Sequence, residues 1–329
     1  MRPFVLCPLA ILASVLVACG GEPDERAAPA SSERLVAPAE GEGYQLSMEA
    51  VVPAGEEAWL CQIGKFPGQG VNHIDRVVSQ QTDAMHHMDV MILAFTDVDL
   101  PPGTYDCAQL YADYASLMEQ GLIVYGAQAA DQELQLPEGI SAPIPGSIPI
   151  MQEIHYVNTT TEDQEVYSDI NVYLMDVEDV TGSIWGSVVR DSHLNIPPNA
   201  KHSEWTRCVM NQDVDLLFIA SHTHELGESV QVRTFDGSQT GALIYENTDW
   251  ESPFVKDYTD QTFHVPSGSG FEFTCHFDND RPEEVHWGFH ATDEMCQIAL
   301  VYTPGNQDIA CEVVDSSDGV LDGLGEEGK

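Results

Sequence analysis

Positively charged residues are scarce in this chain. Its 329 residues include 12 lysines and arginines against 54 aspartates and glutamates, which gives a formal net charge of −42. Nucleic-acid binding depends on clusters of lysine and arginine that neutralise phosphates, so the composition excludes a nucleic acid as the partner. It also argues against electrostatic binding to anionic lipid, and it favours a cationic or neutral ligand over an anionic one.

The sequence also lacks two motifs that are typical of zinc proteins. Its N-terminal apolar run is not long enough to span a membrane. No two cysteines have the C-x-x-C spacing, which argues against a structural zinc site or a thioredoxin-like site. No His-Glu-x-x-His run is present, which argues against a common class of zinc hydrolase. The apolar run at residues 4–17 is too short to span a bilayer, and it follows Arg2 as in a secretion signal.

The end of this apolar run resembles the lipobox of bacterial lipoproteins. It reads Leu-Val-Ala-Cys-Gly, with the cysteine at position 19. The sequence therefore predicts a signal peptide over residues 1–18 and a lipid anchor on Cys19 at the cell envelope, and Gly20 favours the outer membrane. An ordinary signal peptide with an incidental cysteine is the alternative.

Composition divides the remainder of the chain. Residues 19–43 are rich in Ala, Pro, Ser and charge and are expected to form a flexible tether. Residues 313–329 are rich in glycine and acid and are expected to form a disordered tail. The chain between them is long enough for two domains, which we place at residues 44–178 and 179–312.

Strand patterns dominate these two domains. Short apolar or alternating runs, separated by Gly, Pro, Asn and Asp, occur at residues 58–61, 87–96, 148–157, 168–175, 216–220, 228–235, 271–277 and 297–303. Only residues 108–120 have a helical pattern. The expected fold class is all-β, as two tandem antiparallel β-sandwich (jelly-roll) domains.

Histidine motifs lie on three of the predicted strands. His222 and His224 follow an apolar run and, as residues i and i+2 of a strand, would project side by side and could bind one copper, zinc, iron or nickel ion. They could equally be two unrelated polar positions. His86 and His87 are adjacent, so both can bind one ion only if the strand is bulged or twisted, or if they use different ring nitrogens. His155 alternates with apolar residues, and a lone strand histidine is more often structural.

Together with Met295, these motifs resemble the copper type II, ascorbate-dependent monooxygenases. The shared order is His-His-Met at 86–88, His-Tyr at 155–156, His-Thr-His-x-Leu-Gly at 222–227 and Asp-Glu-Met-Cys at 293–296. The resemblance implies two coppers per chain, one in each domain. The electron-transfer site would be His86, His87 and His155. The catalytic site, where O₂ is activated, would be His222, His224 and Met295, whose thioether is a soft ligand that selects Cu(I).

The resemblance also implies a disulfide pairing and a supporting residue. Six cysteines remain after Cys7 and Cys19 are set aside, and they allow 15 pairings. The family pattern selects Cys61–Cys107, Cys208–Cys311 and Cys275–Cys296. It also makes His286, nine residues before Met295, a candidate for orienting a copper ligand.

The implied function is hydroxylation of a C–H bond in a small molecule or peptide, with O₂ and an external one-electron reductant such as ascorbate. Three positions depart from the family member that acts on peptidylglycine: Ala220 replaces an arginine that holds the substrate carboxylate, Ala299 replaces a tyrosine, and Glu225 replaces a histidine. These differences argue against a C-terminal glycine peptide as substrate. The alternative function is a non-catalytic copper-binding lipoprotein for storage, delivery or sensing.

Overall fold

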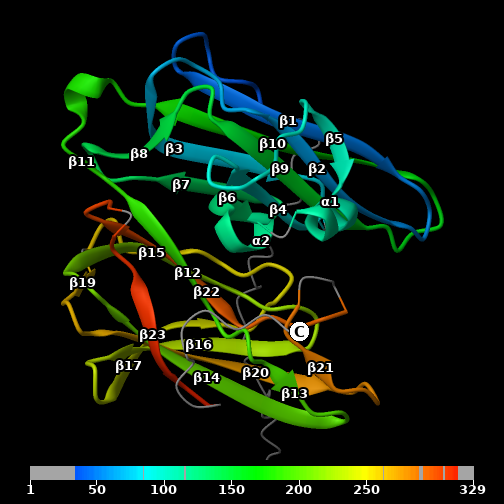
Figure 1. The fold of residues 1–329 in the computed structure, drawn as a ribbon, viewed down its shortest axis with the longest axis vertical. Helices are drawn as coiled ribbons and strands as arrows, with labels where there is room; N and C mark the ends of the chain where they lie inside the picture. The colour runs from blue at the N-terminus through cyan, green and yellow to red at the C-terminus, as the bar shows by residue number, and fades with distance from the viewer. Residues whose placement is uncertain are drawn as a thin grey trace, which may run out of the picture. The chain divides into compact units, whose positions relative to one another are not determined.

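Antiparallel strands make up most of the protein (Figure 1). The computed structural model describes residues 34–317 except residues 84, 115, 262, 289–291 and 307. Its helices within that range are short: α1 (Cys107–Asp113), α2 (Ser116–Gln120) and the 3-10 helix η1 (Val177–Asp179). None of the described helices is long and apolar enough to cross a membrane. The all-β class is therefore confirmed, whereas the signal peptide and Cys19 lie outside the described residues.

The N-terminal half, residues 34–183, contains two sheets. The strands of the first are β1 (Gly43–Val52), β3 (Val71–Gln81), β7 (Asp131–Gln135), β8 (Ile140–Pro145), β10 (Gln164–Leu174) and β11 (Gly182–Ser183). Their order is β1-β10-β3-β8-β11, with β7 also on β3. The second sheet has the order β5-β2-β9-β4-β6. Its strands are β2 (Glu57–Lys65), β4 (Met85–Ile92), β5 (Gly103–Asp106), β6 (Leu122–Ala127) and β9 (Pro149–Val157).

The C-terminal half, residues 184–317, contains two larger sheets and a two-stranded ribbon. One sheet has the order β12-β22-β15-β18, with β19 on β15, and the other has the order β17-β16-β20-β14-β23. The strands of the first are β12 (Trp185–Arg190), β15 (Val214–His222), β18 (Lys256–Asp257), β19 (Phe263–Val265) and β22 (Gln297–Thr303). The strands of the second are β14 (Ala200–Met210), β16 (Gly227–Phe235), β17 (Thr240–Asn247), β20 (Gly270–Asn279) and β23 (Cys311–Ser316). The ribbon is β13 (Asn195–Ile196) with β21 (Val285–His286).

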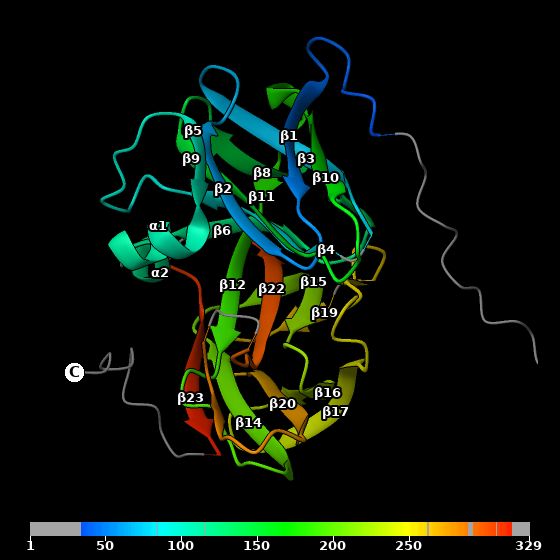
Figure 2. The ribbon, with the colours of Figure 1, turned by 90° about the vertical axis from the view of Figure 1, so that its right-hand side faces the viewer.

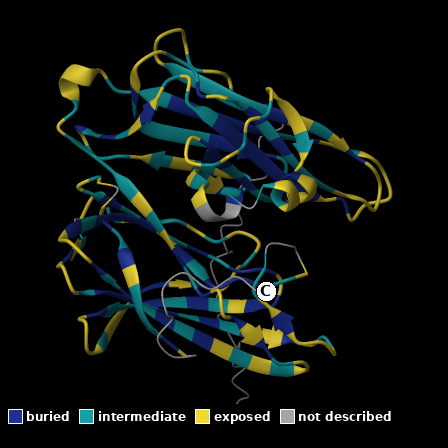
Figure 3. Cartoon of the chain, viewed as in Figure 1, coloured by how far each residue is buried: buried dark blue, intermediate teal, exposed yellow. Residues whose placement is uncertain are grey.

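Side-chain alternation explains why these segments pack as strands. In β20, Phe271, Phe273, Cys275 and Phe277 alternate with more exposed residues and have no exposed surface. Successive strand residues point to opposite faces, so this spacing gives one core-facing side. β9 differs, because all but its end residues are buried, including Glu153 and His155 (Figure 3). Buried polar groups need partners, so β9 is the strand on which a functional cluster is expected.

Buried apolar residues form separate cores in the two halves. One cluster lies between β1, β3 and β10 on one side and β4 and β9 on the other, and it includes Met48, Val90 and Ile170. A large cluster in the C-terminal half includes Phe273 and Tyr302. Each half therefore buries apolar surface of its own, which is the main source of folding free energy.

Three disulfides join distant segments of the described residues. They are Cys61–Cys107, Cys208–Cys311 and Cys275–Cys296, which is the pairing that the family resemblance implies. By restricting the unfolded chain, each is expected to stabilise the protein by about 3–5 kcal/mol. The last one joins β20 to the residue that directly follows Met295.

Ordered contacts extend past two boundaries expected from composition. The tether was expected to extend to residue 43, but Arg34 forms ion pairs with Asp169 and Glu49, and Asn171 donates to the backbone oxygen of Val36. The acidic tail was expected to begin at residue 313, but β23 continues to Ser316 and pairs with β14. Composition does not detect such contacts, because all of these partners except Glu49 lie more than 100 residues away in the sequence.

Candidate metal centre

A β-bulge brings His86 and His87 to one site. On the β4–β9 pair, Met85 is opposite Tyr156 and His87 is opposite His155, so His86 is an extra residue on β4. Nδ1 of His86 lies 2.9 Å from Nδ1 of His87 and 3.1 Å from Nδ1 of His155. A bulge was one of the conditions under which adjacent histidines could share an ion, and the structure meets it.

Carboxylates hold the outer nitrogens of two of these three histidines. Nε2 of His87 donates to Glu153 over 3.0 Å, and Nε2 of His155 donates to Glu57. A proton on Nε2 leaves the Nδ1 lone pair free, and in both rings Nδ1 faces the shared centre. Lone pairs that converge on one point repel one another, whereas a single metal ion between them satisfies all of them. This arrangement fits a metal bound by His86, His87 and His155.

Glu153 is the buried anchor of the three-histidine set. It is 4% exposed and accepts hydrogen bonds from His87, from the indole of Trp59 and from the hydroxyl of Tyr111. Burial by itself raises the pKa of Glu153, but these donors outweigh it and lower the pKa, so the carboxylate stays charged. The Trp59 ring also stacks on His155, with ring centroids 5.5 Å apart. The sequence reasoning missed Glu153, although a glutamate inside an apolar strand was a visible signal.

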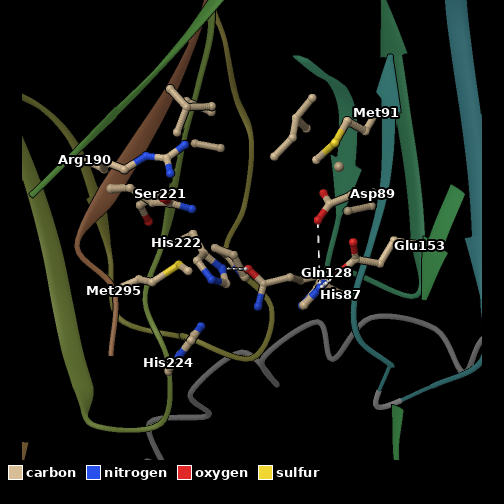
Figure 4. Close-up of a pocket in the computed structure, with 18 of the residues that line it drawn as sticks. His87, Asp89, Met91, Gln128, Glu153, Arg190, Ser221, His222, His224 and Met295 are labelled. Carbon is tan, nitrogen blue, oxygen red and sulfur yellow. Dashed lines mark hydrogen bonds and ion pairs between the residues drawn. The ribbon is translucent and has the colours of Figure 1, made fainter. Parts of the chain in front are cut away.

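His222 and His224 lie at the end of β15 and in the turn that follows. The strand ends at His222, so the two residues do not share one regular strand as expected, yet their ring centroids are only 5.1 Å apart. Nδ1 of His222 donates to the side-chain oxygen of Gln128 over 2.9 Å (Figure 4). Nδ1 of His224 donates to the backbone oxygen of Asp293 over 3.0 Å. Both rings therefore keep Nε2 available as a metal ligand.

Met295 lies beside these two histidines and is 5% exposed (Figure 4). The residue before it, Glu294, is fully buried and accepts from the backbone N–H groups of His224, Leu226 and Met295, at 2.8 to 2.9 Å. Burial raises the pKa of Glu294 to about 7, although these hydrogen bonds oppose the shift. Glu294 therefore ties the histidine turn to the segment that carries the thioether, a role that the sequence reasoning did not assign.

His286 does not support the candidate metal ligands. Its side chain is 63% exposed and lies 3.4 Å from Glu284 as an ion pair. The expectation that it orients a copper ligand is therefore wrong for this structure. β21 turns its side chain to the surface, and its backbone oxygen accepts from the N–H of Glu294 instead.

The two histidine sets are neighbours. The ring of His86 lies 5.5 Å from that of His224 and 6.5 Å from that of His222, measured between centroids. Burial, followed by the repulsion of neighbouring imidazolium charges, lowers the pKa of His86 to about 2, and burial lowers the pKa of His224 to about 4. At neutral pH the rings of His86 and His224 are therefore uncharged, which is the form that binds metal ions.

A cavity of about 230 Å³ adjoins both sets. His87, Asp89 and Glu153 lie on one side of it, and His222 and Met295 lie on the other (Figure 4). The apolar part of its lining includes Val188, Ala220 and Ala299. A small organic molecule in this cavity would lie next to both groups of candidate ligands.

Comparisons with known proteins identify one family. The family model for the C-terminal domain of copper type II ascorbate-dependent monooxygenases matches residues 183–319, which include His222, His224 and Met295. No curated protein matches the chain.

Two solved structures align with most of the chain but are not close to it. PNGase F, a glycosylasparaginase from Flavobacterium meningosepticum, is 9% identical, with 80% of this chain and 96% of that chain covered and a TM-score of 0.29. The PBSX exported protein XepA is 9% identical, with 82% and 88% covered and a TM-score of 0.21. At such low TM-scores neither supports a statement about fold or function.

Proposed function

We propose that this chain, whose residues 183–319 belong to the C-terminal domain family of copper type II ascorbate-dependent monooxygenases, is a copper-dependent monooxygenase. It would hydroxylate a C–H bond of a small molecule or peptide, with O₂ and an external one-electron reductant such as ascorbate. The observation that carries the proposal is the presence of a second, preorganised histidine set beside the ligands of the matched domain.

The donor atoms suit two coppers per chain. His86, His87 and His155 would hold one ion through Nδ1, and His222, His224 and Met295 would hold the other through two Nε2 atoms and a thioether. Imidazole and thioether ligands together suit copper in both of its oxidation states. Copper would supply the one-electron redox chemistry that O₂ activation requires, which redox-inactive zinc cannot supply.

The side chains of the protein have three tasks in this proposal. Glu153 and Glu57 fix the rings of the first set, and Gln128 fixes the ring of His222. Glu294 holds His224 and Met295 in one arrangement through their backbone N–H groups. The adjoining cavity would place a substrate C–H bond beside His222 and Met295.

The proposal includes the architecture and the location of the protein. We infer two tandem jelly-roll domains that divide near residue 178, with one copper site in each. The separate apolar cores of the two halves support this division. The lipobox-like sequence before Cys19 supports a lipid anchor, most consistent with the outer membrane.

Metal analysis of the mature protein tests the proposal directly. We expect two coppers per chain and, in X-ray absorption spectra, sulfur ligation in the Cu(I) state that Met295→Ile removes. We also expect O₂ uptake with a reductant and a competent substrate. A single copper per chain, with no O₂ uptake across a substrate screen, would instead support the non-catalytic copper-binding lipoprotein.

A further inference from the structure

Arg190 lies in the same row of the sheet as His222. On the β12–β22 pair, Arg190 is opposite Gln297, and on the β22–β15 pair, Gln297 is opposite His222. Figure 2 shows β12, β22 and β15 side by side. Residues directly opposite one another in antiparallel strands place their side chains on the same face. All three residues line the cavity beside the candidate metal centre.

The guanidinium of Arg190 is unpaired within the part of the chain that the structure describes. There the Arg190 side chain makes no hydrogen bond, ion pair or stacking contact, although it is half-buried and burial lowers its pKa. Arg34, Arg207 and Arg281, by contrast, each pair with at least one carboxylate. In a chain with 54 acidic residues, carboxylates are abundant. A half-buried charge without a partner is costly, so its presence in a cavity points to a ligand of opposite charge.

Small and apolar residues form the next row of the same sheet. Val188 is opposite Ala299, and Ala299 is opposite Ala220. All three line the cavity, and the two alanines leave open space next to Arg190 and His222. The cavity therefore has a cationic end and an apolar floor. Figure 4 shows the Arg190 guanidinium directed into the space between the two walls.

We propose that Arg190 binds the carboxylate of the substrate, whose apolar body lies along Val188, Ala299 and Ala220. A guanidinium can bind a carboxylate through two parallel hydrogen bonds, and the amide of Gln297 can donate a further one. This arrangement places the apolar body next to His222 and Met295. The inference rests on the proposed function, because it names the substrate class of that site.

Charge balance selects a monocarboxylate over a dianion. Arg190 supplies one positive charge, whereas Asp89 and Glu153 lie on the opposite wall of the cavity. A phosphate or dicarboxylate would leave excess negative charge in a partly buried space. The inference also revises the expectation from composition that a cationic or neutral ligand is favoured. Net charge describes the average surface, whereas one guanidinium determines the field at this end of the cavity.

Calorimetric titration with matched acids and amides tests the proposal. The probes are phenylacetate, benzoate and hexanoate with their amides, which differ in charge but little in size, and phenyl phosphate as a dianion. Titrations use the mature protein with and without copper, since a carboxylate can also coordinate the metal directly. We expect at least one acid to bind about 10-fold or more tightly than its amide, with and without copper, and phenyl phosphate to bind more weakly.

Substitutions test whether Arg190 causes the preference for acids over amides. Arg190→Gln should remove it and Arg190→Lys should retain part of it, with copper content unchanged in both. Arg233 is also half-buried and lies outside the residues that line the cavity, so Arg233→Gln should keep the full preference. The proposal is overturned if no acid binds better than its amide, if phenyl phosphate binds best, or if Arg190→Gln retains the preference.

Copper content and O₂ uptake separate this inference from the function on which it rests. If acids bind through Arg190 but the copper-loaded protein consumes no O₂ with any substrate, the proposed function fails and the anion site is not a hydroxylation site. If O₂ is consumed with a neutral or cationic substrate and Arg190→Gln has no effect on KM, the function stands and the carboxylate inference fails.

Discussion

The two groups of candidate copper ligands are held in place by different means. His86, His87 and His155 come from two paired strands, and carboxylate side chains fix the outer nitrogens of His87 and His155. His224 and Met295 lie in loop segments, where Glu294 fixes the backbone through three N–H groups. The first group is therefore built into a sheet. The second depends on how two loop segments are joined.

This difference suits the two roles in the proposed function. A site that stores an electron benefits from rigid ligands, because little should move when its charge changes. A site that binds O₂ and substrate needs space and adaptable ligands, and a methionine on a loop offers both. The comparison predicts that substitutions at the first site mainly affect metal affinity. At the second site they should affect turnover and local stability.

The largest effect is expected from Met295→Ile. It removes the thioether but keeps an apolar side chain, so O₂ uptake should fall to background while copper at the three-histidine set remains. Met210→Ile is the matched control, because Met210 is also buried in the same half and lies outside the cavity. Oxygen-electrode assays and metal analysis measure the outcome. Full turnover in Met295→Ile would show that the thioether is not part of the reactive site.

Glu153→Gln should weaken copper binding at the three-histidine set by about 10–100-fold, the range typical for groups that orient a ligand. The substitution keeps the size of the side chain but removes the charge that holds His87. Glu57→Gln provides the comparison, because Glu57 holds His155 in the same way but its side chain is 51% exposed and should matter less. Competition with a copper chelator measures both affinities. An equal or larger effect of Glu57→Gln would contradict the role of Glu153 as the buried anchor.

Glu294→Gln should destabilise the C-terminal half by about 1–3 kcal/mol, because an amide NH₂ group would face backbone N–H donors. Copper affinity at the three-histidine set should not change. Urea unfolding of the copper-free protein measures the stability, and Glu225→Gln, at an exposed position in the same turn, is the control. If Glu294→Gln instead lowered copper affinity at the first set, the two groups would not be held independently.

Local patterns in the sequence predicted eight of the strands, and local motifs indicated the candidate ligands. The run at residues 271–277 falls in β20, for example, because apolar alternation depends only on neighbouring residues. His222 and His224 were also found from a local motif. The sequence did not show, however, that β15 ends at His222, before His224. A bulge was recognised as one condition under which His86 and His87 could bind the same ion, but nothing in the local sequence required that bulge.

The groups that support the ligands could not be predicted in this way. Glu153 contacts His87 across 66 positions in the sequence, Gln128 contacts His222 across 94, and Glu294 contacts His224 across 70. These roles depend on which strands become neighbours, which no short motif encodes. Arg190 was missed for the same reason, because it has no motif and its place next to Gln297 follows from strand order.

Gln128→Leu should have the smallest effect among these substitutions. Gln128 lies in the N-terminal half and accepts the Nδ1 proton of His222, so its loss leaves the ring in place but less firmly oriented. A hydrogen bond of this kind contributes about 1 kcal/mol, so we expect turnover to fall by about 5-fold, with copper content retained. Gln128→Glu keeps an acceptor and should retain most of the activity. If Leu and Glu at this position behave alike, Gln128 does not orient His222, and the second site is held by its own half alone.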